Sequence, residues 1–171
     1  MQLKDILSNA HDQLRFAETK HASNLAFNGV LIFGFIRLLL LPGTETSTSI
    51  LLVTTLAILC CGYSSVTSIR SFFPNTDNTP KKNQTIQGPN LVYFDHLGRL
   101  SEDEFLRLYY QKSNICEKEM LEIDKDMANQ IIVISQIASN KFRLFSEAVI
   151  FTISATLLGS VFLVLIIASR A

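Results

Sequence analysis

The chain has no tryptophan, only three cysteines and no excess of charge of either sign. With 15 basic and 15 acidic residues, it lacks the global basic field that attracts nucleic acid. The cysteines, Cys60, Cys61 and Cys116, have neither the CxxC nor the His/Cys spacing of a metal site, and neighbouring cysteines rarely bridge each other. Without tryptophan, an aromatic belt at a membrane interface must consist of phenylalanine and tyrosine.

Catalytic signatures are also missing from the sequence. It contains no phosphate-binding P-loop, no GxGxxG, no HExxH and no GxSxG. His11, His21 and His96 lie far apart and have no companion nucleophile, and the acidic run over 117–126 is typical of the solvated face of a helix. We therefore expect a protein that is not an enzyme and that needs neither a metal nor a cofactor.

What the chain has in excess is long apolar runs. Apolar residues make up 48% of the sequence and gather in three blocks, 24–41, 49–69 and 148–169, with the charges almost entirely outside them. A helix of about 20 such residues crosses a hydrocarbon core of about 30 Å. Because a helix satisfies its own backbone groups, lipid tolerates it. The sequence therefore predicts three membrane-spanning helices.

Amphipathic stretches precede the first and third spans, with no helix breaker between. We predict that each stretch runs into its span as one helix and that their apolar seams pair in parallel, within or between subunits. We expect the soluble part to be too small to bury a core of its own, and we therefore predict a homo-oligomer whose seams complete the core. The seam residues recur at spacings of three and four: Leu3, Leu7, Ala10, Leu14, Ala17 and His21 in the first stretch, and Met120, Ile123, Met127, Ile131, Ile134, Ala138 and Phe142 in the second.

Between the second and third spans, the sequence predicts a linker and a small helical module. Proline, glycine and polar residues forbid a long helix over 71–90. An aromatic segment follows over 91–97, and Ser101 with Glu104 forms a capping box that starts a short helix. Asn114 resembles a further N-cap.

The expected fold class is an all-α membrane protein with three transmembrane helices, two of them continuous with long amphipathic helices, and a small helical module. The turn over 42–48 has no Lys or Arg, so the positive-inside rule predicts that the N-terminus and residues 70–143 are cytoplasmic and that the C-terminus lies outside. The predicted parts are a cytosolic helix over 1–23, a transmembrane hairpin over 24–70, the linker over 71–90, a cytosolic module over 91–143 and the third span over 144–169.

Polar residues within the spans have two interpretations that stay open. Asn28 and Arg37 interrupt the first span. Arg37 is near enough to the end of that span to reach the interface, and the alternative is that it lines a pore or pairs subunits. On the second span, small and weakly polar residues recur by three and four, as on faces where helices approach closely. Helix packing and pore lining both fit this pattern. The residues concerned are Asn28, Arg37, Thr54, Ala57, Cys61, Ser64 and Ser68.

Charged residues mark the point where each amphipathic stretch meets its span. They are Glu18 and Lys20 before the first span, and Lys141 and Arg143 before the third. We expect Glu18, Lys20 and Lys141 at a similar depth, where partial dehydration strengthens an ion pair. This membrane-edge cluster is a candidate latch between the soluble helices and the spans. The alternative is that the lysines bind lipid phosphates.

Three short motifs, in this order, resemble those of the transmembrane effectors of the Pycsar anti-phage systems. Residues 17–22 are similar to the family's acidic-x-Lys-Ala motif, with His21 inserted and Glu18 in place of the commoner Asp. Residues 93–105 are similar to its aromatic segment and leucine-serine helix start, and residues 136–142 to its Ile-Ala-x-x-Lys-aromatic motif. The resemblance covers roughly residues 14 to 168.

The resemblance implies an inner-membrane effector paired with a cyclase that makes cyclic CMP or cyclic UMP after infection. Such an effector disrupts the membrane and stops phage spread. A nucleotide site needs a cation, a stacking surface and polar groups, which Tyr93, Phe94, His96 and Arg99 supply within seven residues. The alternative for Tyr93 and Phe94 is packing onto the long helices. The alternative for the whole chain is a pore or structural partner, similar to the two-span SLATT effectors, that another protein controls without a nucleotide.

Overall fold

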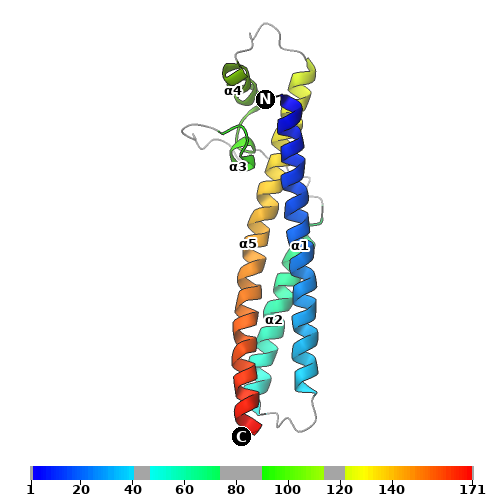
Figure 1. Cartoon of the computed structure of the whole chain (residues 1–171), viewed down its shortest axis with the longest axis vertical. Coiled ribbons are helices and arrows are strands. Elements are labelled where there is room, and N and C mark those ends of the chain that lie inside the picture. Colours follow the sequence, from blue (N-terminus) through cyan, green and yellow to red (C-terminus); the bar gives the residue numbers. More distant parts are fainter. Residues whose placement is uncertain (1, 41–46, 74–89, 114–121, 171) are drawn as a thin grey trace. The chain divides into compact units, whose positions relative to one another are not determined.

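The computed structural model describes residues 2–40, 47–73, 90–113 and 122–170, which form five helices and no strand (Figure 1). Three of these helices are long and apolar enough to cross a membrane. The chain is therefore an all-α membrane protein, and the predicted fold class is confirmed. The helices are α1 (Leu3–Leu39), α2 (Thr48–Arg70), α3 (Phe94–Leu97), α4 (Glu102–Ser113) and α5 (Glu122–Arg170).

Two of the spanning helices are much longer than a bilayer requires. Helix α1 has 37 residues and α5 has 49, so they are about 55 Å and about 73 Å long at about 1.5 Å per residue. Each amphipathic stretch therefore continues into its span without a break, as predicted. The N-cap predicted at Asn114 and most of the linker predicted over 71–90 lie outside the described residues.

The chain divides into two compact units. One unit, called the α3–α4 unit below, comprises Met1–Glu18 and Pro74–Phe142. The other, called the three-span unit, comprises Thr19–Phe73 and Arg143–Ala171. Helices α1 and α5 contribute residues to both units, whereas α2 belongs to the three-span unit alone.

The α3–α4 unit buries a hydrophobic core within a single chain. Ile6 of α1, Leu97 of α3, Phe105 and Leu106 of α4, and Ile131 of α5 are each 1% exposed or less and belong to one cluster. The expectation that the soluble part is too small for a core of its own was therefore wrong. Chain length alone does not reveal that α3 and α4 cover the apolar faces of α1 and α5.

The predicted seams coincide with the buried faces only in part. On α1, Leu3, Ala10, Ala17 and His21 are buried, as the spacing predicts. On α5, Ile123 is 58% exposed, so the seam does not extend to this residue. The buried face of α5 is wider than the predicted seam, which has two residues per seven, because α3 and α4 also cover this helix. It takes in residues that the heptad spacing omits: Ala128, Ile132 and Ser135.

The capping box predicted at the start of α4 is confirmed. The backbone N–H of Ser101 donates to the Glu104 carboxylate at 3.0 Å, and the N–H of Glu104 donates to the Ser101 hydroxyl at 3.3 Å. These bonds, the backbone one foremost, lower the pKa of Glu104. Near the end of α4, the Tyr110 hydroxyl donates to Asp124 at 2.7 Å. Burial, followed by this bond, raises the pKa of Tyr110 to about 12.

In the three-span unit, α1, α2 and α5 lie side by side (Figure 1). Their outward surface is apolar, with exposed residues such as Phe33, Leu52 and Leu157, and this suits contact with lipid. Their buried interior changes character along its length. Asn28 and Ser64 are buried in one half, whereas the other half is an apolar cluster of Phe35, Ile50, Ala57, Cys61, Ala155, Phe162 and Ile166.

Candidate functional site: a junction of three sequence motifs

Residues from all three of the short motifs described above meet in the α3–α4 unit. Helix α1 contributes residues 16–18, α3 and the turn after it contribute residues 94–99, and α5 contributes residues 136–142. We call this set the motif junction. Glu18 and Phe142 are the last residues of the α3–α4 unit on α1 and on α5. The junction therefore lies at the point where both helices leave this unit.

Two polar contacts attach α1 and α3 to the same stretch of α5. The Lys141 ammonium lies 3.0 Å from a Glu18 carboxylate oxygen, and the Lys141 side chain is only 13% exposed. The Ser139 hydroxyl donates to one oxygen of Asp95 at 2.7 Å. Arg99 donates to the other oxygen of Asp95 at 2.6 Å. The Glu18 side chain is 43% exposed, so the ion pair is only partly shielded from water.

Aromatic and backbone contacts reinforce the junction. The ring of Phe94 stacks on that of Phe142, with centroids 4.9 Å apart, and Phe16 approaches the same ring at 6.2 Å. A Cβ at Gly98 would lie 3.0 Å from the backbone nitrogen of Gln136, so the turn after α3 lies directly against α5. A displacement of α3 would therefore act on α5 through the backbone as well as through side chains.

The four residues predicted to bind a ligand lie together on α3 and its flanks. Phe94 and Arg99 are engaged in the junction, through Phe142 and Asp95. Tyr93 is 46% exposed and meets His96 edge to face at 5.0 Å. His96 is half-buried, and its Nδ1 accepts a hydrogen bond from the backbone of Asn90 at 3.3 Å. Tyr93 and His96 thus present ring surface on the same short segment that carries the Arg99–Asp95 pair.

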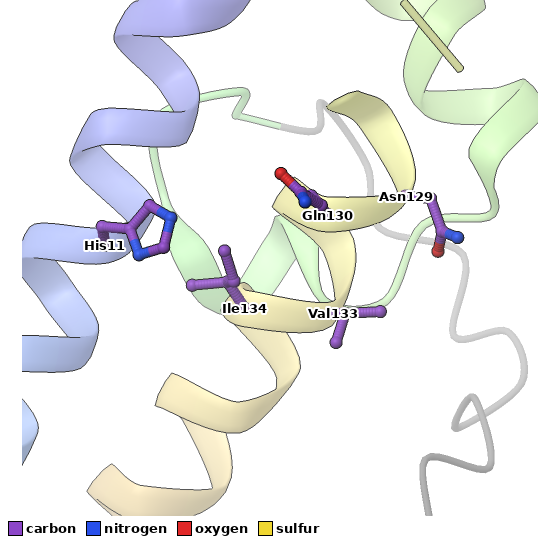
Figure 2. Close-up of a pocket in the computed structure, with 5 residues that line it drawn as sticks. All are labelled: His11, Asn129, Gln130, Val133 and Ile134. Carbon is purple, nitrogen blue, oxygen red and sulfur yellow. The ribbon is translucent and has the colours of Figure 1, made fainter. Parts of the chain in front are cut away.

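A shallow hollow elsewhere in this unit, of about 270 Å³, is lined by His11, Asn129, Gln130, Val133 and Ile134 (Figure 2). The His11 ring points toward Ile134, whereas Asn129 and Val133 project from another side of α5. Its polar groups do not converge on one point, so it has none of the geometry of a phosphate site. Among the residues that the structure describes, no group of three or more His, Cys, Asp or Glu could hold a metal ion.

Of the predicted membrane-edge cluster, the structure brings Glu18 and Lys141 together. The other two residues belong to the three-span unit. There the Lys20 ammonium lies over the Phe145 ring, 5.3 Å from its centroid, and Arg143 is exposed. Phe145 was not predicted at this position, since nothing in the local spacing pairs it with Lys20.

The polar residues predicted in the spans lie mostly between helices of the same chain. The Asn28 amide donates to Ser64 at 3.1 Å, Ser68 accepts from Asn24 at 3.0 Å, and Cys61 is buried. Thr54 donates to the carbonyl of Ile50 in its own helix, and Arg37 is exposed. Sequence reasoning missed Asn24 and Thr152, which complete these contacts. Asn24 could have been predicted from the sequence, because it precedes Asn28 by one helical turn.

The fold and the motif junction define a helical membrane protein whose soluble unit is attached to the helices that enter its spans. The family model of the Pycsar effector protein domain matches residues 2–168. The chain therefore belongs to the Pycsar effector family, and it is an effector of anti-phage defence; the predicted resemblance is confirmed. No curated protein and no solved structure matches the chain.

Proposed function

We propose that a cyclic pyrimidine nucleotide, cyclic CMP or cyclic UMP, triggers this effector after a partner cyclase makes it during infection. The effector then oligomerises or opens and disrupts the bacterial inner membrane, so that the infected cell stops phage spread by abortive infection. Family membership over residues 2–168 supports the defence role, and three spanning helices support action on the bilayer. The proposal requires no catalytic step and no cofactor besides the nucleotide.

The observation that carries the mechanism is the motif junction. Phe94 and Asp95 of α3 contact Phe142 and Ser139, at the end of the α5 segment that belongs to the α3–α4 unit. A ligand that binds differently to two arrangements of α3 shifts the equilibrium between them. The shift acts on α5, and through Lys141 on α1, next to the residues that enter the three-span unit.

The surface of α3 offers the chemistry of a nucleotide site. Tyr93 and His96 present rings on which a pyrimidine base can stack. Arg99 supplies a guanidinium, which binds phosphate through paired hydrogen bonds. Asp95 now neutralises Arg99 at 2.6 Å, so an incoming phosphate competes with this carboxylate. When Arg99 turns to the phosphate, Asp95 loses one of its two partners. The hydrogen bond that Asp95 accepts from Ser139 then changes as well.

We infer that the N-terminus and residues 70–143 face the cytoplasm, where the cyclase product accumulates, and that the C-terminus is periplasmic. The Lys/Arg asymmetry of the sequence supports this orientation. We also infer a homo-oligomer. Leu14 and Ile134 are only half-buried within one chain, which leaves apolar surface on both long helices for a second copy.

Calorimetry on the purified full-length protein tests the trigger. We expect binding of cyclic CMP or cyclic UMP and no binding of cyclic AMP. Arg99→Gln should weaken binding at least tenfold, whereas Arg107→Gln, which removes an exposed arginine from α4, should leave it unchanged. If neither pyrimidine nucleotide binds, the trigger is wrong; if Arg99→Gln binds as the wild type does, the assignment of the site to α3 is wrong.

A further inference from the structure

A buried polar network joins all three helices in one half of the three-span unit. Its members are Asn24, Asn28, Ser64, Ser68 and Thr152, each 8% exposed or less. The Asn28 amide donates to Ser64 at 3.1 Å and to Thr152 at 3.0 Å. The Asn24 amide donates to Ser64 at 2.9 Å, and its oxygen lies 3.0 Å from the Thr152 hydroxyl. The network is neutral, and its members are hydrogen-bonded mainly to one another.

The other half of the same interior is apolar and tightly closed. Phe35 of α1 and Phe162 of α5 meet edge to face with centroids 6.2 Å apart. A Cβ at Gly159 would lie 2.6 Å from the Phe35 ring, so the ring fills the space that this glycine leaves. Ala57 and Ala155 are fully buried beside them. We call Phe35, Phe162 and the residues around them the phenylalanine plug.

We propose that this interior is the closed form of a permeation path for water and small ions, lined by the polar network and gated by the phenylalanine plug. The inference rests on the proposed function and adds the route by which the membrane is breached. Apolar constrictions gate channels by excluding water, and neutral amides and hydroxyls can line a wet path without selecting one charge. Polar residues inside a membrane often mark such pathways.

When the helices separate, the polar side chains of the network lose the partners that they have in the closed form. Packing alone does not require the network, because the fully buried Ala57 and Ala155 close the other half by apolar contact. Interhelical hydrogen bonds in membranes are individually weak, so the network can part. Exposing its five side chains to lipid would be costly, whereas water satisfies them. An opened bundle is therefore stable only if water enters between the helices.

The first test needs no trigger. Thr152→Val keeps the shape of the side chain but removes the hydroxyl that Asn24 and Asn28 contact. The matched control is Thr156→Val, because the Thr156 hydroxyl donates to the Thr152 carbonyl in its own helix at 2.9 Å. Thr152→Val should raise basal potassium efflux from proteoliposomes at least fivefold, and Thr156→Val should leave it unchanged. A bilayer that stays tight with folded Thr152→Val overturns the inference, because the network is then only helix packing.

The second test locates the path. In a chain whose three cysteines are replaced by alanine, Ser64→Cys places a thiol in the network, and Ser68→Cys repeats the test one turn away. A charged, membrane-impermeant thiol reagent should modify these thiols only after cyclic CMP or cyclic UMP has started efflux. Leu157→Cys, at a side chain that is 64% exposed toward lipid, should stay unmodified throughout.

The outcomes separate this inference from the proposed function. Efflux without modification of either thiol overturns the path and leaves the nucleotide trigger standing. A different result is that neither nucleotide starts efflux but Thr152→Val does. If Ser64→Cys or Ser68→Cys is then modified in a chain that also carries Thr152→Val, the trigger is wrong and the path stands.

Discussion

Gly159→Ala is the most direct way to disturb the phenylalanine plug. The added Cβ would lie 2.6 Å from one atom of the Phe35 ring and 2.7 Å from the next. Real Cβ contacts are essentially never shorter than 3.0 Å, and ordinary contact begins at 3.4 Å. The ring must therefore retreat by at least 0.4 Å, the difference between 3.0 and 2.6, and by 0.8 Å to reach ordinary contact. Phe35 is 7% exposed and packs on the fully buried Phe162, so the ring has little room to move.

Overpacking of this kind costs about 1–3 kcal/mol. Alanine also favours a helix over glycine by about 1 kcal/mol, but α5 is helical whether or not the bundle opens, so this gain cancels in the opening equilibrium. The clash acts only on the closed form. We therefore expect the open population to rise by a factor of about 5 to about 150.

The assay is potassium efflux from proteoliposomes without nucleotide, alongside the same protein's thermal unfolding. Gly62→Ala is the control: it makes the same chemical change in α2, where an added Cβ meets nothing within 4 Å. Gly159→Ala should leak and Gly62→Ala should not. If both variants are equally tight and equally stable, the plug does not hold the path closed and the reasoning fails.

Four further outcomes are expected. Lys141→Glu should strongly change triggered depolarisation in cells, and Glu18→Lys in the same chain should partly restore it; absence of any rescue rejects the latch. The pKa of Tyr110 is about 12 in the folded chain against about 10 when unfolded, so its contribution is complete below pH 10 and is lost as the pH rises to 12. The melting temperature should therefore fall more over this range for the wild type than for Tyr110→Phe, and equal slopes would contradict the assignment. A C-terminal alkaline phosphatase fusion should be active in the periplasm; activity of a cytosolic reporter there instead reverses the topology. Leu14→Asp should remove the oligomer on a sizing column while the chain still inserts, and an unchanged particle size counts against assembly through this face.

Features that depend on neighbouring residues could be predicted from the sequence. The apolar runs give the three spans, because crossing a bilayer is a matter of length and composition. The absence of breakers gives the continuity of α1 and α5. Ser101 and Glu104 are three residues apart, so their reciprocal hydrogen bonds follow from local geometry alone.

Contacts between distant segments could not be predicted in the same way. The core that joins Ile6, Phe105 and Ile131 requires α4 to fold back on two helices, which no local period encodes. Asn28 and Thr152 are 124 residues apart, and Thr152 resembles the other hydroxyl residues of α5 until its partners are known. The charges of the membrane edge were readable, but the pairing of Glu18 with Lys141 depends on the rotation of both helices.

The central claim is that a pyrimidine nucleotide acting on the α3–α4 unit opens the membrane. The most direct test is potassium efflux from proteoliposomes that contain the wild-type protein alone, with nucleotide added on the side that residues 70–143 face. Cyclic CMP or cyclic UMP should start efflux within the time of binding, cyclic AMP should not, and Arg99→Gln should need a higher nucleotide concentration. A nucleotide that binds but leaves the vesicles tight, with the protein inserted and folded, would contradict the account.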